Sequence, residues 1–281
     1  MKKRIVIVCH QIPKLNHASS TINILKREWE LSGFEVGTVL GIRHDITGDV
    51  AINHVDLTVT PDPYLDYLKK YPIVINGKVR SISKTSFSKQ LLKPDDDHEG
   101  KVIIKTNNNC GGASELKLAG RKTWFINRIT RNISWARSIS LESANYPILE
   151  SIRSVPSGVW ENEHLIVEKF LPEQDNEGNY RLRAWSFLGD RSLHVLTTSN
   201  YPVVKGHNIL KREILAGKVP DELISYRKQM GIDYGRFDYA IVDGRVVLYD
   251  INRTPTTSSK AALLYFHKLK EMAAGIHDFL S

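Results

Sequence analysis

The pattern of apolar and polar positions at the start of the chain predicts two strands joined by one helix. RIVIVC (4–9) is an unbroken apolar run typical of a buried strand, and TINILKREWELSG (21–33) repeats apolar residues at helical spacing. A second strand follows in EVGTVLG (35–41). This order predicts a small α/β lobe. Further strands are predicted at residues 55–60 (VDLTVT), 71–77 (YPIVING) and 101–106 (KVIIKT), with a helix at 83–92.

The second half of the chain has a stronger β pattern. The hairpin FDYAIV-DG-RVVLYDIN (237–252) has an Asp-Gly turn between two alternating runs, and helices are predicted at 221–230 and 259–279. The Trp- and Arg-rich segment 121–137 fits neither pattern clearly. Other predicted strands are LIVEKF (165–170), YRLRAWSFL (180–188) and SLHVLTTS (192–199). The predicted fold class is therefore α/β followed by α+β.

Composition is ordinary for a soluble protein, with 281 residues, 41% of them hydrophobic and 25% charged. No apolar stretch approaches the roughly 18 residues of a membrane span, and the apolar run at the N-terminus is too short for a secretory signal. Cys9 and Cys110 are too far apart in sequence to indicate a zinc motif or a disulfide framework. We therefore expect free thiols, a cytoplasmic location and no membrane partner.

The net charge of +8 favours an anionic partner. The chain has no long Lys/Arg run and no repeat of aromatic and basic residues, which argues against nucleic acid. A nucleotide or an acidic metabolite remains as the expected partner.

The segment KVIIKTNNNCGG (101–112) combines a strand that ends near Lys105 with a loop of Asn and Gly residues. Both residue types adopt left-handed backbone conformations, so successive N–H groups can point at one phosphate. No GK[ST] follows the glycines, so the loop is not a Walker motif. Taken alone, such a loop is also compatible with an ordinary turn.

The hairpin carries the clearest candidate metal ligands. Asp250 and Asn252 share a strand face, because side chains alternate with period two. A two-residue loop at 243–244 would put Asp238 on the opposite face, whereas a three-residue loop with a bulge would put all three side chains on one face. Oxygen ligands of this kind suit Mg²⁺.

Read in order, six segments of the chain resemble the ATP-grasp superfamily over about residues 73–257. They are SISK with Lys84, VIIKT with Lys105, VEKFL with Glu168, RLRAW with Arg183, GRFDY with Asp238 and YDINRTPT with Asp250. The resemblance implies an ATP-grasp fold, in which two α+β subdomains hold a nucleotide, here at 76–167 and 168–281 after an N-terminal lobe at 1–75. Asp250 stands where the family usually has Glu, which indicates a divergent branch.

The resemblance also implies roles for individual residues. Asp238, Asp250 and Asn252 would be metal ligands, normally for two Mg²⁺ ions, with Mn²⁺ as an alternative. Arg183 matches an arginine that neutralises the transferred phosphate, and Arg253, beside the end of the metal strand, is a second candidate catalytic residue. Lys205, His10 and His17 are further candidates for the substrate side. The implied nucleotide-binding residues are Lys84, Lys105, Asn109, Gly111, Gly112, Glu168, Lys169, Phe170 and Leu171.

The activity common to the superfamily is ATP-dependent ligation. The resemblance therefore implies that ATP phosphorylates a small-molecule or peptide carboxylate and that an amine, a thiol or a similar nucleophile then attacks the acyl phosphate. Two alternatives remain open: an ATP-grasp kinase acting on a hydroxyl, and a non-catalytic protein that binds nucleotide or nucleic acid on the same fold. A homodimer is compatible with the family, but no segment of the sequence indicates an interface.

Overall fold

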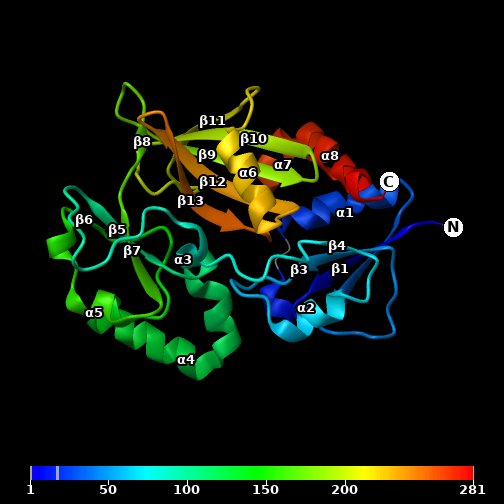
Figure 1. The fold of residues 1–281 in the computed structure, drawn as a ribbon, viewed down its shortest axis with the longest axis horizontal. Helices are drawn as coiled ribbons and strands as arrows, with labels where there is room; N and C mark the ends of the chain where they lie inside the picture. The colour runs from blue at the N-terminus through cyan, green and yellow to red at the C-terminus, as the bar shows by residue number, and fades with distance from the viewer. Residues whose placement is uncertain (1, 17–18, 281) are drawn as a thin grey trace.

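The computed structural model describes residues 2–16 and 19–280, which fold into three β-sheets with helices packed around them (Figure 1). Short 3₁₀ helices occupy Pro13–Leu15, Asn109–Gly112, Trp135–Arg137, Ile152–Ser154 and Ala274–Phe279. No helix in the described ranges is both long and apolar enough to cross a membrane.

The N-terminal sheet is parallel and lies between two layers of helix. It contains β1 (Arg4–Cys9), β2 (Glu35–Leu40), β3 (Val50–His54) and β4 (Ile73–Ile75) in the order β2-β1-β3-β4. Alternate residues of β1 pack toward α1 (Thr21–Leu31) and toward α2 (Asp62–Leu68), so both faces of the strand are buried. This double burial explains why the segment reads as an unbroken apolar run.

The predicted strand at 55–60 is wrong. The third strand of this sheet is β3, which ends at His54, and the segment after it makes one isolated β-bridge, from Val59 to Ser81. Its backbone groups bond to the segment around residues 80–82 instead, through Thr60 N to Arg80 O and Ile82 N to Thr58 O. The segment is thus extended but does not join the sheet.

A three-stranded antiparallel sheet follows, in the order β6-β5-β7. Its strands are β5 (Val102–Thr106), β6 (Ile148–Leu149) and β7 (Leu165–Lys169). The Trp- and Arg-rich segment forms most of α4 (Ala113–Ile133), which is kinked at Gly120, while α5 (Ser157–Trp160) is one turn long. The helix predicted at 83–92 is only α3 (Lys84–Phe87).

The largest sheet has six antiparallel strands in the order β11-β10-β9-β12-β13, with β8 paired to β9. One face packs on α6 (Asp221–Met230), and the other carries α7 (Ser259–Leu264) and α8 (Phe266–Ala273) (Figure 1). The predicted single C-terminal helix is therefore interrupted, at Tyr265. The strands are β8 (Glu173–Gln174), β9 (Tyr180–Leu188), β10 (Arg191–Ser199), β11 (Ile209–Ile214), β12 (Tyr234–Val242) and β13 (Arg245–Asn252).

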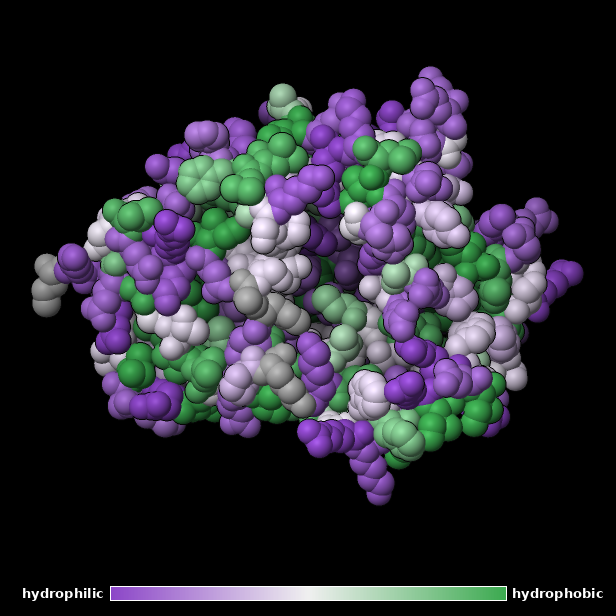
Figure 2. All heavy atoms as spheres, turned by 180° about the vertical axis from the view of Figure 1, so that it is seen from behind, coloured by the Kyte–Doolittle hydropathy of each residue, from purple (hydrophilic) through white to green (hydrophobic). Residues whose placement is uncertain are grey.

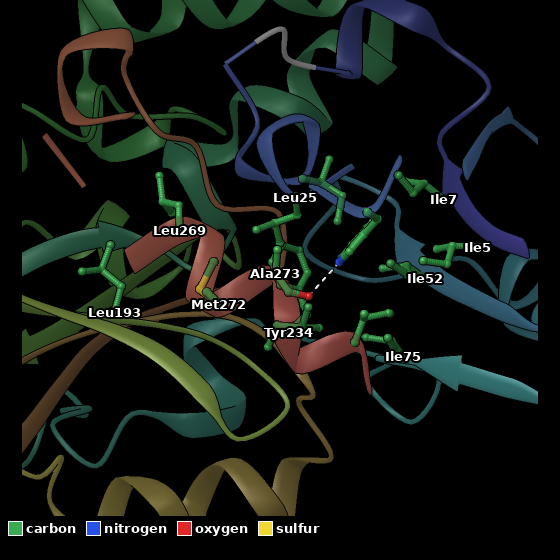
Figure 3. Packing of buried hydrophobic residues seen from close by; sticks show 14 of the residues in the cluster. Ile5, Ile7, Leu25, Ile52, Ile75, Leu193, Tyr234, Leu269, Met272 and Ala273 are labelled. Carbon is green, nitrogen blue, oxygen red and sulfur yellow. Dashed lines mark hydrogen bonds between the residues drawn. The ribbon is translucent and has the colours of Figure 1, made fainter. Parts of the chain in front are cut away.

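Helix α8 joins the N-terminal sheet to the six-stranded sheet. Met272 and Leu269 pack in one hydrophobic cluster with Leu25 of α1 and with side chains of both sheets (Figure 3). The Trp29 indole N–H donates a hydrogen bond to the Ala273 carbonyl at 2.8 Å, so this large ring is buried without an unsatisfied donor. The first and last parts of the chain therefore share one core, which fixes the sheet that carries the hairpin.

Candidate active site

A cavity of about 250 Å³ lies between the three-stranded sheet and the end of the six-stranded sheet. From behind, the molecule has a hollow lined by hydrophilic residues near the middle of its face (Figure 2). Predicted site residues that line the cavity are Lys84, Lys105, Glu168, Lys169, Phe170, Leu171, Asp238, Asp250 and Asn252. These nine residues come from α3, β5, β7, the segment after β7, β12 and β13, so the fold brings together segments that are distant in sequence.

The β12–β13 hairpin places Asp238 and Asp250 on one face by means of a bulge. Its turn has two residues, Asp243 and Gly244, with φ angles of 50° and 73°, as a type I′ turn requires. This turn alone would separate the two carboxylates. However, Tyr239 pairs with Leu248 while Asp238 pairs with Asp250, which leaves Tyr249 as an extra residue in β13.

This bulge corrects the expectation that the turn alone sets the offset between the two strands. It also directs Tyr249 toward the other wall of the cavity, where its hydroxyl donates to the Leu171 carbonyl at 2.5 Å. The Lys105 ammonium lies 5.4 Å from the centre of the Tyr249 ring. The bulge in β13 thus places Asp238 opposite Asp250 and brings Tyr249 into contact with the facing wall of the cavity.

Asp238 has one carboxylate oxygen that is engaged and one that is not. Oδ2 accepts from Arg236 Nη2 at 2.8 Å, whereas Oδ1 is buried and has no hydrogen-bond partner in the described part of the chain. Burial raises the pKa of Asp238 above its ordinary value; Arg236 opposes the rise and Asp250 adds to it. The free Oδ1 is therefore available to bind a cation.

Lys84 and Lys105 carry charge to the same cavity and are themselves almost completely buried. Lys84 Nζ lies 3.3 Å from Asp250 Oδ1 and donates to the Asn108 carbonyl at 3.0 Å. Burial lowers the pKa of Lys84, but Asp250, Tyr146 and Glu168 together outweigh it, and the pKa is raised overall. Lys105 Nζ pairs with Glu168 Oε2 at 2.6 Å. Lys84 therefore stays charged beside Asp250, and Lys105 lies on the facing wall of the cavity, paired with Glu168.

Two arginines predicted to be catalytic do not line the cavity. Arg183 donates two hydrogen bonds to Glu173, at 3.0 and 2.6 Å, because it lies on the opposite face of β9 from the cavity. Arg253 is fully buried and donates to the carbonyls of Val79 and Leu57, which ties the end of β13 to the N-terminal lobe. Neither guanidinium is placed to meet a ligand in this cavity.

The Asn/Gly loop also lies differently from its predicted arrangement. Asn109, Gly111 and Gly112 do not line the cavity, whereas Cys110 does. Gly111 is needed for packing, since a Cβ there would lie 2.1 Å from the Leu141 carbonyl oxygen, and Gly112 precedes α4 with a φ of 75°. The loop holds its shape through contacts with the 139–141 segment rather than by facing the cavity.

The histidine candidates do not contribute to this cavity within the described residues. His10 is buried against Tyr64 and its Nδ1 accepts from the Ile12 backbone N–H at 3.1 Å. His17 lies outside the described residues. Lys205, the remaining substrate-side candidate, does line the cavity, and its Nζ donates to Ser143 Oγ at 3.0 Å.

Arg236 is the main residue that sequence reasoning missed. It lines the cavity beside Asp238 because it lies two positions earlier on the same strand face, a signal that the period-two pattern contains. Arg181 also lines the cavity. Ser143 and Tyr146 come from the irregular segment after α4, where no sequence pattern indicated a role.

The donor set on the hairpin fits a hard divalent cation. Asp238 and Asp250 supply carboxylate oxygens, and the amide oxygen of Asn252 accepts from the Thr254 backbone N–H, at 2.8 Å, and from its hydroxyl at 3.3 Å. No group of three or more His, Cys, Asp or Glu residues in the described ranges could hold a metal. A Mg²⁺ ion here would thus need further oxygens, such as phosphates or water.

No protein-family model and no curated protein matches the chain. Solved structures do match it over nearly their whole length. An ATP-grasp ligase from Chryseobacterium gregarium, in complex with ADP and a leader and core peptide, has a TM-score of 0.57 at 8% identity and covers 99% of this chain and 97% of its own.

Two further structures also align with nearly the whole of this chain. A RimK domain ATP-grasp protein from Sphaerobacter thermophilus has a TM-score of 0.54 at 9% identity, with 98% of both chains covered. D-alanine–D-alanine ligase from Bacillus anthracis has a TM-score of 0.50 at 12% identity, with 99% of this chain and 97% of its own covered. The low identities indicate a divergent sequence on a common fold.

Proposed function

We propose, starting from the ATP-grasp fold of this chain, that it is an ATP- and Mg²⁺-dependent ligase that activates a carboxylate as an acyl phosphate. The observation that carries the proposal is the face of the hairpin. Asp238 and Asp250 are paired across two strands and line one cavity with two buried lysines from other elements, Lys84, which contacts Asp250, and Lys105. Paired acids opposite buried cations are what a metal–polyphosphate complex requires.

The proposed nucleotide site uses both walls of the cavity. Lys84 and Lys105 would contact the phosphates, and the segment from Glu168 to Leu171, with the side chains of Phe170 and Leu171, would hold the base. Apolar residues line this part of the cavity, among them Ile103, Phe170, Leu171, Leu182 and Val247. Residues 76–167 and 168–281 are the proposed grasping subdomains.

Asp238, Asp250 and Asn252 would hold the metal. When bound, Mg²⁺ supplies positive charge that neutralises the phosphates. The unpartnered Oδ1 of Asp238 is the ligand most ready to bind, whereas Asp250 must exchange its contact with Lys84. Because phosphates would draw Lys84 away from Asp250, we expect nucleotide and metal to bind more tightly together than alone.

Arg236 and Lys205 are the proposed contacts for the reacting acid, in place of Arg183 and Arg253. Both line the cavity beside Asp238. Burial lowers the pKa of Lys205, although Asp238 and Asp250 oppose the shift. Two cations there can orient a substrate carboxylate and neutralise charge as the phosphoryl group transfers.

The proposed reaction has two balanced steps. A carboxylate oxygen of the acid attacks the γ-phosphorus of ATP, the bond to the β-phosphate oxygen breaks, and ADP leaves. The nitrogen or sulfur of the second substrate then attacks the acyl carbon, and inorganic phosphate leaves with the electron pair of the broken C–O bond. The proton of the nucleophile passes to solvent or phosphate.

Two structural neighbours support the choice of cofactors and the range of acids. The C. gregarium ligase was solved with ADP and with peptides, and the ligase PsnB was solved with a precursor variant, Mg and ADP, at a TM-score of 0.54 and 10% identity. These complexes belong to those proteins. They support ATP, Mg²⁺ and either a small or a peptide carboxylate as substrates of this chain.

The test is incubation with ATP, Mg²⁺, hydroxylamine and pools of carboxylic acids. Formation of ADP together with a hydroxamate supports the ligase. ADP with a phosphorylated alcohol would indicate a kinase instead. The absence of both turnover and Mg²⁺·ATP binding would contradict the proposal.

A further inference from the structure

A second cavity, of about 400 Å³, opens beside the first on the same face of the six-stranded sheet. Its floor is formed by β9, β10, β11 and β12, and α7 and α8 cover it. The two cavities share the wall residues Leu182, Val204, Lys205, Arg236, Asp238 and Thr256. A ligand in the second cavity would therefore reach Asp238, one of the proposed metal ligands, directly.

The strand register shows how the two cavities are connected. Cross-strand partners share a sheet face, and Asp250 pairs with Asp238, which pairs with Ala184, which pairs with Val195. This row leads from the paired acids to an apolar floor. Apolar residues around the second cavity are Leu182, Ala184, Leu193, Val195, Val204, Ile209, Ala261 and Leu269.

Unpartnered polar atoms stand at both ends of this row. At the near end, Arg236 Nε and Asp238 Oδ1 are buried without a hydrogen-bond partner in the described residues. At the far end, the hydroxyl of Tyr265 is also buried without a hydrogen-bond partner in the described residues, and the residue is only 6% exposed. Buried polar groups are normally satisfied, and a polar ligand at each end of the cavity would satisfy these atoms.

The charges around the second cavity point to an anion. Lys205, Arg212 and Arg236 line it, whereas Asp238 is its only carboxylate among the described lining residues and already pairs with Arg236. Arg212 forms no ion pair within the described chain and lies near Tyr265, whose pKa burial raises and Arg212 lowers. One cation thus lies at each end of the cavity, Lys205 near the acids and Arg212 away from them.

We propose that this cavity binds the acid that the ligase activates, and that the acid is an elongated dicarboxylate with an apolar middle. One carboxylate lies at Arg236 and Lys205 beside the metal site, and the other lies at Arg212 and the Tyr265 hydroxyl. The backbones of β12 and β11 are three strand spacings apart, about 14 Å, so we expect an elongated diacid to span the two ends better than a short one. The inference rests on the proposed ligase function and names its substrate class.

Acid length and distal charge can be varied separately in the hydroxylamine assay. With Mg²⁺·ATP, we expect kcat/KM for suberate to exceed that for succinate, which is too short, and that for octanoate, which lacks the distal charge. Arg212→Gln should lower the suberate-to-octanoate ratio about tenfold. Lys211→Gln is the matched control, because Lys211 is exposed on the same strand and pairs with Glu213. It should leave the ratio unchanged.

A variant that fills the cavity separates this inference from the proposed function. Ala261→Phe inserts a ring from α7, and should raise KM for suberate while Mg²⁺·ADP binding, measured by calorimetry, is retained. An unchanged suberate KM in this variant, or an unchanged ratio in Arg212→Gln, would overturn the inference while leaving the ligase intact.

Negative results with the wild-type protein distinguish failure of the proposed function from failure of the inference. If it binds no Mg²⁺·ADP, the proposed function fails and the inference with it. If it forms hydroxamates with no preference for suberate, only the inference fails. If it binds Mg²⁺·ADP but turns over none of these acids, calorimetry of suberate on that complex decides, and absence of binding overturns the inference.

Discussion

The two faces of the six-stranded sheet are built from alternate residues of the same strands and differ in almost every property. On one face, Trp185, Phe187 and Phe237 pack together beneath α6, with ring centroids 4.5 to 5.7 Å apart. On the other, Arg236 and Asp238 form an ion pair and line two cavities. Because side chains alternate along a strand, residues that pack in the core and residues that line the cavities lie on opposite faces of the same sheet.

The contrast teaches where each kind of substitution should act. Residues on the packed face are buried mainly against one another and against α6, so changing them should alter the free energy of unfolding first. Residues on the cavity face hold charge that the chain alone does not fully compensate, so changing them should alter binding and turnover first.

The largest effect is expected from Phe237→Ala on the packed face. Phe237 is fully buried between two aromatic rings, so its truncation should lower the free energy of unfolding by about 3–5 kcal/mol. Denaturant titration followed by tryptophan fluorescence measures the change. Phe125→Ala on α4 is the matched control, since Phe125 is 57% exposed and should cost far less. Equal losses in the two variants would contradict the contrast.

Asp250→Asn on the cavity face should lower ATP turnover about a hundredfold to a thousandfold, because it removes a proposed metal ligand. The amide keeps an oxygen near Lys84, so we expect the native fold to survive. Asp250→Glu preserves the charge and should retain much more activity than the amide. Wild-type turnover in Asp250→Asn, measured as ADP formed with saturating acid, would remove Asp250 from the site.

Arg183 and Arg236 sharpen the comparison, because they lie on opposite faces of neighbouring strands. Arg183→Gln breaks the paired hydrogen bonds to Glu173 and should cost about 2 kcal/mol of stability. Arg236→Gln should instead lower acid-dependent turnover about tenfold, with a smaller loss of stability. Unfolding curves and steady-state kinetics on both variants provide the test. The reverse assignment of effects would mean that the catalytic arginine is Arg183.

The smallest expected effect is a loss of stability at low pH that arises from His194 on the packed face. Burial lowers the pKa of His194, and Arg183 lowers it further. The unfolded chain therefore takes up a proton below about pH 6.5 that the folded chain excludes, so stability is present above that pH and is lost as pH falls. His194→Gln should lose less stability between about pH 7.5 and about pH 5 than the wild type does. Identical pH profiles would show that His194 does not control this loss.

Sequence patterns predicted the hairpin, and with it the residues that face the cavity, because alternation and the Asp-Gly turn are local signals. They did not predict the bulge at Tyr249, since a tyrosine at that position is typical of a regular strand. They also favoured Arg183 over Arg236. Which face of a strand meets a cavity depends on the order of strands and on the helices that cover them, and neither is a local property.

Arg253 and the Asn/Gly loop show the same limit. Arg253 follows the metal strand directly, but the chain turns there into the N-terminal lobe and its guanidinium bonds to two distant carbonyls. The composition of the Asn/Gly loop is typical of phosphate binding and of tight packing alike. Only the contact of Gly111 with Leu141 shows which requirement the glycine meets in this chain.

The most direct measurement is calorimetric titration of ADP, with and without Mg²⁺, into the wild type and Asp250→Asn. Because Asp238 and Asp250 are paired on the cavity face, Mg²⁺ should strengthen ADP binding to the wild type and have little effect on the variant. An equal gain from Mg²⁺ in both proteins would contradict the claim that this face of the hairpin holds the metal–nucleotide complex.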